Sequence, residues 1–319
     1  MISRRLLLAS AAAMALAAPA FAQGKLDVVA TFSILGDIVA NIGGDRVEVT
    51  TLVGPDGDAH VFQPSPADAQ AVAGAAVIVV NGLGFEGWMD RLVEASGTHA
   101  ALIDASRGIT PIAFGEDDHD HGHDEGAHDH DHAEDTGHEG HDHGAFDPHA
   151  WQSVTNVALY VANIAEGLSA ADPEGTQEYK ANANAYLAEL DALDAEIRAA
   201  VAALPEGRRT VVTSHDAFGY FAADYGLAFV APQGVSTESE ASARDVAALI
   251  AQIREQDIAA VFVENIADRR LLDQIASETG AHIGGTLYSD ALSAADGPAA
   301  TYLAMMRHNL AQLSAALMR

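Results

Sequence analysis

Cysteine is absent from the 319-residue chain, which excludes disulfide bonds and thiolate metal sites. Any tight site for a transition metal must therefore be built from histidine and carboxylate side chains. Basic residues are scarce as well, because 16 Lys and Arg stand against 46 Asp and Glu, for a formal net charge of −30. This charge argues against binding to nucleic acid or to anionic membranes, whereas it suits a cationic ligand.

Residues 1–22 have the pattern of a cleavable secretory signal. Arg4 and Arg5 precede an apolar stretch from Leu6 to Ala18, and Ala20-Phe21-Ala22 fits a small-x-small cleavage site. The stretch is shorter than the roughly 20 residues that a membrane-spanning helix needs, and no cysteine follows it for lipid attachment. We expect a periplasmic mature chain without a lipid anchor; general and twin-arginine export both stay open.

The remainder of the chain alternates strand and helix patterns in two sets. This alternation predicts an α/β fold of two lobes, each with a mostly parallel sheet flanked by helices. We assign residues 23–171 to the N-terminal lobe and 205–319 to the C-terminal lobe. In the first, strands are expected at 26–32, 47–53, 75–81 and 101–104, and helices at 66–74 and 87–96, with helical patterns resuming at Trp151. In the second, strands are expected at 210–214, 227–231, 259–263 and 282–286, and helices at 217–225, 241–256 and 268–279.

A long helix is expected to connect the lobes over residues 172–204. Asp172 suits the N-cap position and Pro173 the first helical position. Apolar residues from Tyr179 to Val201 recur at three- and four-residue spacings and form one stripe. About 30 residues at 1.5 Å each span roughly 45 Å, so the helix can run along both lobes and limit their hinge motion.

Residues 116–143 differ from the rest of the chain, because they contain nine histidines, twelve acidic residues and almost no apolar side chains. Such a composition cannot bury a core, so we expect a disordered insertion in the N-terminal lobe. Its His-Asp-His repeats predict weak secondary zinc sites, or else the segment is a solvated loop without a role. The histidines are His119, His121, His123, His128, His130, His132, His138, His141 and His143.

Three other histidines, His60, His149 and His215, lie where the chain leaves a predicted strand or enters a helix. Asp290 follows a predicted strand in the same way. Loops at the carboxyl ends of parallel strands form the ligand crevice of open α/β sheets, so two ligands from each lobe could hold one metal ion. Alone, each of these residues could instead be a surface or capping residue.

These motifs resemble the cluster A-I solute-binding proteins of zinc and manganese ABC importers, over essentially the whole mature chain. The matching pieces are His60-x-Phe62-x-Pro64-Ser65, Asp147-Pro148-His149-Ala150-Trp151, Ser214-His215-Asp216-Ala217-Phe218 and Leu287-Tyr288-Ser289-Asp290. The resemblance implies that His60, His149, His215 and Asp290 bind the metal. It also implies that the protein delivers the ion to a membrane permease, and that the long helix joins the lobes.

The ligand set predicts zinc, because three imidazoles and one carboxylate suit tetrahedral Zn²⁺, whereas manganese favours oxygen-rich sites of higher coordination. Manganese-binding members of the family usually have an acidic residue where this chain has His215. Without a cysteine pair, and with Ala59 before the first ligand, the chain looks more like the AztC-type branch than like ZnuA itself.

Three other carboxylates and two other functions complete the predictions. Asp147, Asp216 and Glu264 are candidates to accept hydrogen bonds from ligand imidazoles, although each could instead cap a turn or end a strand. We expect a monomer without catalytic activity, loaded in part by a periplasmic zinc donor protein. The alternatives are a zinc hydrolase, whose three-histidine site would keep an open position for water, and a manganese-binding or adhesin-type relative.

Overall fold

The computed structural model describes residues 24–113, 146–258 and 260–318. The expected signal at 1–22 and the histidine-rich segment at 116–143 lie outside these residues. Within the described part of the chain, no helix combines the length and the apolar character needed to cross a membrane.

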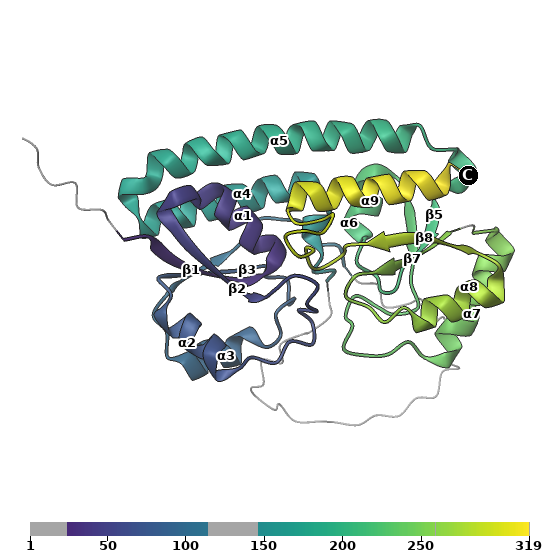
Figure 1. Cartoon of the computed structure of the whole chain (residues 1–319), viewed down its shortest axis with the longest axis horizontal. Helices are drawn as coiled ribbons and strands as arrows, with labels where there is room; N and C mark the ends of the chain where they lie inside the picture. The colour runs from purple at the N-terminus through teal and green to yellow at the C-terminus, as the bar shows by residue number, and fades with distance from the viewer. Residues whose placement is uncertain (1–23, 114–145, 259, 319) are drawn as a thin grey trace, which may run out of the picture.

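The N-terminal lobe is built on a four-stranded parallel sheet in the order β2-β1-β3-β4. Helices α1 and α4 lie on one side of this sheet, and α2 and α3 lie on the other (Figure 1). The strands are β1 (Leu26–Phe32), β2 (Val47–Val53), β3 (Val77–Val80) and β4 (Ala101–Asp104), and the helices are α1 (Ser33–Gly43), α2 (Pro66–Gly74), α3 (Met89–Ser96) and α4 (Val154–Ala171).

The C-terminal lobe repeats this design with a parallel sheet in the order β6-β5-β7-β8. In both sheets the first strand of the lobe pairs with the second and third on its two sides, so the direction of winding reverses beside it. The strands are β5 (Thr210–Val212), β6 (Ala228–Val230), β7 (Ala260–Glu264) and β8 (His282–Leu287), and the helices are α6 (Gly219–Tyr225), α7 (Ala243–Gln256), α8 (Arg270–Thr279) and α9 (Tyr302–Leu317).

Helix α5 (Thr176–Ala202) runs along both lobes, packing on α1 and α4 of the first and on α6 and α9 of the second (Figure 1). The predicted stripe from Tyr179 to Val201 is buried. The helix begins later than expected, because Asp172 and Pro173 start a separate 3-10 turn, Pro173–Gly175, whose Gly175 N–H donates to the Asp172 side chain. The expected two-lobed α/β fold with one long connecting helix is confirmed.

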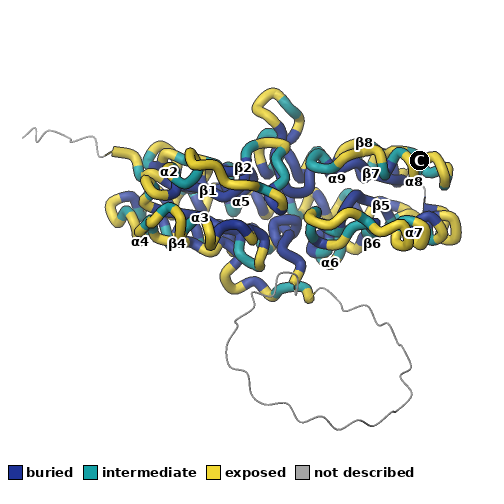
Figure 2. Tube along the Cα trace, turned by 90° about the horizontal axis from the view of Figure 1, so that it is seen from below, coloured by how far each residue is buried: buried dark blue, intermediate teal, exposed yellow. Residues whose placement is uncertain are grey.

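A single large hydrophobic core continues from the N-terminal sheet through α5 into the C-terminal lobe. A smaller core lies between β7 and helices α7 and α8. Figure 2 shows buried chain running through the middle of the molecule, where the lobes meet. Because the large core crosses between the lobes, rotating one lobe against the other would expose apolar surface.

Candidate metal centre

Three of the four predicted ligands, His60, His215 and Asp290, lie in loops that follow the carboxyl ends of strands. His60 is in the loop after β2, and His215 is the third residue after β5. His149 immediately precedes the 3-10 turn η2 (Ala150–Gln152). Asp290 follows β8. The parallel topology directs these ends toward the interface, which is why residues far apart in sequence meet there.

The structure brings His60, His149, His215 and Asp290 together, with one donor atom from each within 4.8 Å of all the others. His149 Nε2 lies 3.3 Å from both His60 Nε2 and His215 Nε2. Asp290 Oδ2 lies 3.3 Å from His60 Nε2 and 3.1 Å from His215 Nε2. Ligands placed about 2.0–2.1 Å from a tetrahedral zinc ion are about 3.3 Å from one another, so the donor spacing fits such an ion.

Asp290 is fully buried, and neither of its carboxylate oxygens accepts a well-aligned hydrogen bond from the described residues. A buried carboxylate in this state is costly unless a cation compensates it. Burial alone would raise the pKa of Asp290, but the charges of His215 and His149 outweigh it and hold that pKa well below its usual range. The donor set is therefore a site for positive charge, either protons or a metal ion.

Two of the histidines are each backed by a buried carboxylate. Asp147 Oδ1 accepts the backbone N–H of His149 at 2.9 Å and lies 2.7 Å from its ring Nδ1. Glu264 Oε1 accepts the N–H groups of Ser214 and His215, at 2.7 and 2.9 Å. Its Oε2 lies 2.7 Å from His215 Nδ1, close but not aligned for a hydrogen bond. Both carboxylates orient Nε2 of their imidazole toward the centre of the site.

The charge around His215 determines its protonation. Burial lowers the pKa of His215, but the carboxylates of Glu264 and Asp290 outweigh this effect and raise the pKa well above the ordinary value. A metal ion entering the site must therefore displace a firmly held proton. Of the three carboxylates considered in the sequence, Asp147 and Glu264 contact ligand imidazoles. Asp216 instead pairs through its backbone N–H, which donates to Gly234 O at 3.1 Å.

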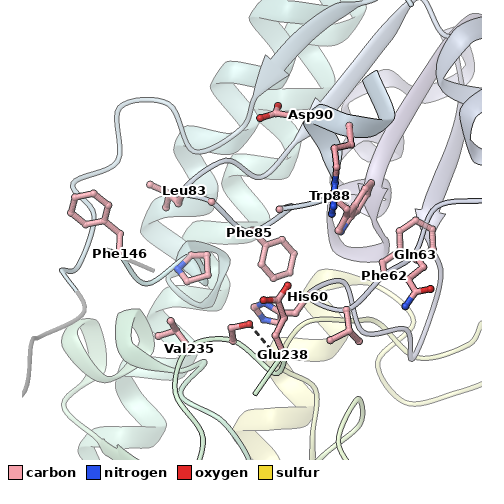
Figure 3. A pocket seen from close by; sticks show the side chains of 16 residues that line it. His60, Phe62, Gln63, Leu83, Phe85, Trp88, Asp90, Phe146, Val235 and Glu238 are labelled. Carbon is pink, nitrogen blue, oxygen red and sulfur yellow. Dashed lines mark hydrogen bonds between the residues drawn. The ribbon is translucent and has the colours of Figure 1, made fainter. Parts of the chain in front are cut away.

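His60 has different surroundings. Asp58 Oδ1 accepts its backbone N–H at 2.9 Å, and the Phe85 ring packs edge-on against its imidazole with centroids 4.8 Å apart. His60 is 7% exposed, whereas the other three ligand candidates are 0% exposed. A cavity of about 760 Å³ adjoins it, lined by residues that include Phe62, Phe85, Trp88, Val235 and Glu238 (Figure 3). This cavity is the open side of the site.

The opposite side is held across the lobes by several hydrogen bonds. The Trp151 indole and the Gln152 amide both donate to Ser289 O, at 2.8 and 2.7 Å. The backbone N–H of Leu292 donates to Ser33 Oγ at 2.9 Å. The segment that carries Asp290 is therefore fixed to the N-terminal lobe. Asp290 has little freedom to move away from the ligand candidates of that lobe.

A further buried carboxylate, Glu86, lies behind the N-terminal half of the site. Glu86 Oε1 accepts from Thr31 Oγ1 and from the Asn81 N–H, both at 2.6 Å, and its burial raises the pKa of Glu86 to about 7. The Asn81 side chain in turn donates to Pro148 O at 2.9 Å. This network was not predicted from the sequence, although an acidic residue inside the run Gly84-Phe85-Glu86-Gly87-Trp88 is a signal for a buried polar role.

Comparisons with known proteins agree with this architecture. A family model described as zinc-uptake complex component A, periplasmic (ZnuA), matches residues 28–316. The manganese-binding lipoprotein MntA of Halalkalibacterium halodurans is 34% identical over 285 residues, which cover 89% of this chain and 86% of that protein. The iron-binding protein YfeA of Yersinia pestis is 34% identical over 300 residues, which cover 94% of this chain and 88% of that protein. The solved structure of the periplasmic zinc binding protein TroA from Treponema pallidum is similar with a TM-score of 0.81 at 31% identity, covering 93% of this chain and 100% of that chain.

Proposed function

This chain belongs to the ZnuA family of periplasmic metal-binding solute-binding proteins, and from that premise we propose that it captures one Zn²⁺ ion between its lobes and delivers it to an ABC-type importer. His60, His149, His215 and Asp290 would supply the four ligands. The observation that carries the proposal is the buried convergence of these four side chains with donor atoms within 4.8 Å of one another.

The choice of zinc rests on ligand chemistry and spacing. Three imidazole nitrogens and one carboxylate form a compact donor set, and the 3.3 Å separations between Nε2 atoms suit a tetrahedral ion. All four side chains are nearly or fully buried, which leaves little room for the extra oxygen ligands that manganese favours. The resemblance to the AztC-type branch, in which an aspartate closes the site, supports the same choice.

Manganese and iron are the second candidates, because two relatives of 34% identity are named for these metals. The deciding experiment is a competition. The mature protein lacking residues 116–143 is stripped of metal, offered Zn²⁺, Mn²⁺ and Fe²⁺ together under anaerobic conditions, and analysed for bound elements. We expect one equivalent of zinc. One equivalent of manganese or iron with no zinc would overturn the choice of metal while leaving the site intact.

The protein is proposed to act as a carrier without catalytic activity. A three-histidine zinc site is catalytic when the fourth position holds water, and in the proposed site Asp290 would take that position. If Asp290→Ala keeps tight zinc, or if the parent chain hydrolyses model esters in a zinc-dependent way, the hydrolase alternative gains support. The permease in the membrane is the partner that the carrier role requires.

The histidine-rich segment is proposed to bind further zinc weakly and to receive it from a donor protein. The proposal rests on its composition and on the position of its C-terminal flank, since Phe146 lines the cavity beside His60. Calorimetry on a chain lacking residues 116–143 tests whether the weak zinc sites belong to this segment and the tight site to the cleft between the lobes. One tight equivalent should remain while the weaker equivalents disappear, and loss of the tight equivalent would contradict it.

A further inference from the structure

The two oxygens of Asp58 bond to different lobes. Oδ1 accepts the backbone N–H of His60 at 2.9 Å. Oδ2 accepts the hydroxyl of Thr237 at 2.7 Å, and Thr237 belongs to the C-terminal lobe. Asp58 therefore joins the peptide of one ligand candidate directly to the opposite side of the cleft.

Thr237 lies in the segment from Pro232 to Ala241, which is also tied to the third histidine. Gln233 forms an isolated bridge with His215, and Gly234 O accepts the N–H of Asp216 at 3.1 Å. The segment thus follows β6, pairs with the chain at His215, and reaches the His60 loop through Thr237. The Asp58–Thr237 hydrogen bond therefore links the backbone at His60 to the backbone at His215 without passing through the metal site.

The bond lies on the open side of the site. Val235, Ser236 and Glu238 of the same segment line the cavity of about 760 Å³ next to His60 (Figure 3). The side of the site beside Asp290, in contrast, has four hydrogen bonds between the lobes that involve Ser289 and Leu292, one of them from the Asp56 N–H to Leu292 O at 2.9 Å. We expect an ion to leave through the side of the site whose hydrogen bonds between the lobes break first. The side with fewer such bonds then determines the rate of release.

We propose that Asp58 is a positioning residue that holds His60 against the C-terminal lobe, and that breaking its hydrogen bond to Thr237 is the step that frees His60 and releases the metal. The proposal rests on the proposed function, since it treats His60 as a ligand. It predicts that the bond slows dissociation of the ion while leaving its association and final coordination unchanged.

The test measures zinc dissociation from the loaded full-length protein into excess chromophoric chelator. Thr237→Val removes the hydroxyl at almost constant volume, and we expect dissociation to accelerate by about fivefold to tenfold, the size of one hydrogen bond. Thr237→Ser keeps the hydroxyl and should dissociate at the parent rate. Combining Asp58→Ala with Thr237→Val should give no more acceleration than Asp58→Ala alone, because the two groups act through one bond.

Ser236→Ala is the matched control within the segment. Its hydroxyl accepts the Glu238 N–H at 3.2 Å and makes no contact with Asp58. Equal acceleration by Ser236→Ala and Thr237→Val would overturn the proposal, because general loosening of the segment would then explain both. An unchanged rate in Thr237→Val would overturn it as well.

Cobalt substitution supplies a readout that a damaged site would change. The visible spectrum of the Co²⁺ protein should be the same in the parent and in Thr237→Val, since His60 still binds in the closed state. A changed spectrum would show lost coordination and would overturn the proposal. If the parent itself retains no zinc, the proposed function fails and this inference fails with it, whereas a slow parent and an equally slow Thr237→Val refute the inference alone.

Discussion

The site contains two Asp-x-His segments that share their backbone geometry but differ in the use of the carboxylate. In Asp147-Pro148-His149 and in Asp58-Ala59-His60, the aspartate accepts the histidine N–H at 2.9 Å. Asp147 then also contacts the ring of its own histidine at 2.7 Å. Asp58 uses its other oxygen for Thr237 across the cleft.

The difference shows how one short motif can give two kinds of ligand. The His149 ring is oriented by a carboxylate of its own segment, and Tyr220 of the C-terminal lobe holds the backbone of that segment. His60 is oriented by the Phe85 ring and, through Asp58, by the contact with Thr237 of the other lobe. Its position therefore depends on how the two lobes are packed together. A carrier needs both properties, because it must bind tightly and still release its cargo.

Removing the ligands themselves should have the largest effect on this comparison. We expect His149→Ala and His60→Ala each to lower zinc affinity by more than about a hundredfold, beyond the effect of losing a supporting residue. His149→Ala should be the more severe, because it removes the preoriented ligand. Competition titration with a chelator of known affinity measures both. A milder effect for His149→Ala than for His60→Ala would reverse the assignment of roles.

Glu264→Gln extends the comparison to the third histidine. The amide oxygen can still accept the two backbone N–H groups, but the amide nitrogen then faces His215 Nδ1 and favours the tautomer with its proton on Nε2. We expect a loss of affinity of about a hundredfold at high pH. Asp147→Asn is the matched control, because one oxygen of Asp147 makes both of its contacts, and its loss should be smaller.

The pH profile follows from the same charges. The pKa of metal-free His215 is raised, so its proton persists to higher pH and competes with zinc. Affinity should therefore fall with decreasing pH from above about 6.5, the ordinary histidine value. Removing the negative charge in Glu264→Gln lowers that pKa and should move the fall to lower pH. Titrations from pH 8 to 5 check this, and affinity independent of pH would contradict the three-histidine site.

The two aspartates give the most direct contrast. Asp147→Ala removes the acceptor from the His149 ring and should lower zinc affinity by about 10- to 100-fold. Asp58→Ala should lower it by less than about tenfold, because the His60 ring loses no direct partner. The affinity measurement is the same chelator competition, with circular dichroism to establish that both variants fold. Equal losses would remove the distinction between the two segments.

Tyr220→Phe should have the smallest effect. The Tyr220 hydroxyl donates to Asp147 O at 2.9 Å and accepts the Ile112 N–H at 3.1 Å, so it supports the backbone of the His149 segment and not its ring. We expect the free energy of unfolding to fall by about 1–2 kcal/mol, with less than about a threefold change in zinc affinity. Urea unfolding and titration separate the two quantities.

Local sequence patterns predicted most of the fold where turn residues mark the element ends. The helix expected at residues 66–74 is confirmed at the same bounds as α2, where Ser65 caps the helix with a reciprocal Asp68 contact and Pro66 begins it. Helix α1 was missed, because β1 passes directly into it at Phe32 without a side-chain cap. Helix α9 was also missed; its buried residues pack on β8 and α5, which are long-range contacts.

The four converging residues were named from motifs, whereas the groups that orient them depended on topology. Glu264 was suspected at a strand end, yet its partner could be found only because β7 lies beside β5 in the sheet. The Asp58–Thr237 contact joins residues 179 positions apart. No local pattern encodes such a pair, since it results from the packing of two completed lobes.

The cross-lobe bonds of the Asp290 segment have a consequence for the order of synthesis. Of the four ligand candidates His60 leaves the ribosome first and Asp290 last, and Trp151 of the first lobe gains its indole partner only when Ser289 arrives. Neither half of the gene should therefore yield a working module. An occupied site would require that both lobes have been synthesised and have folded together.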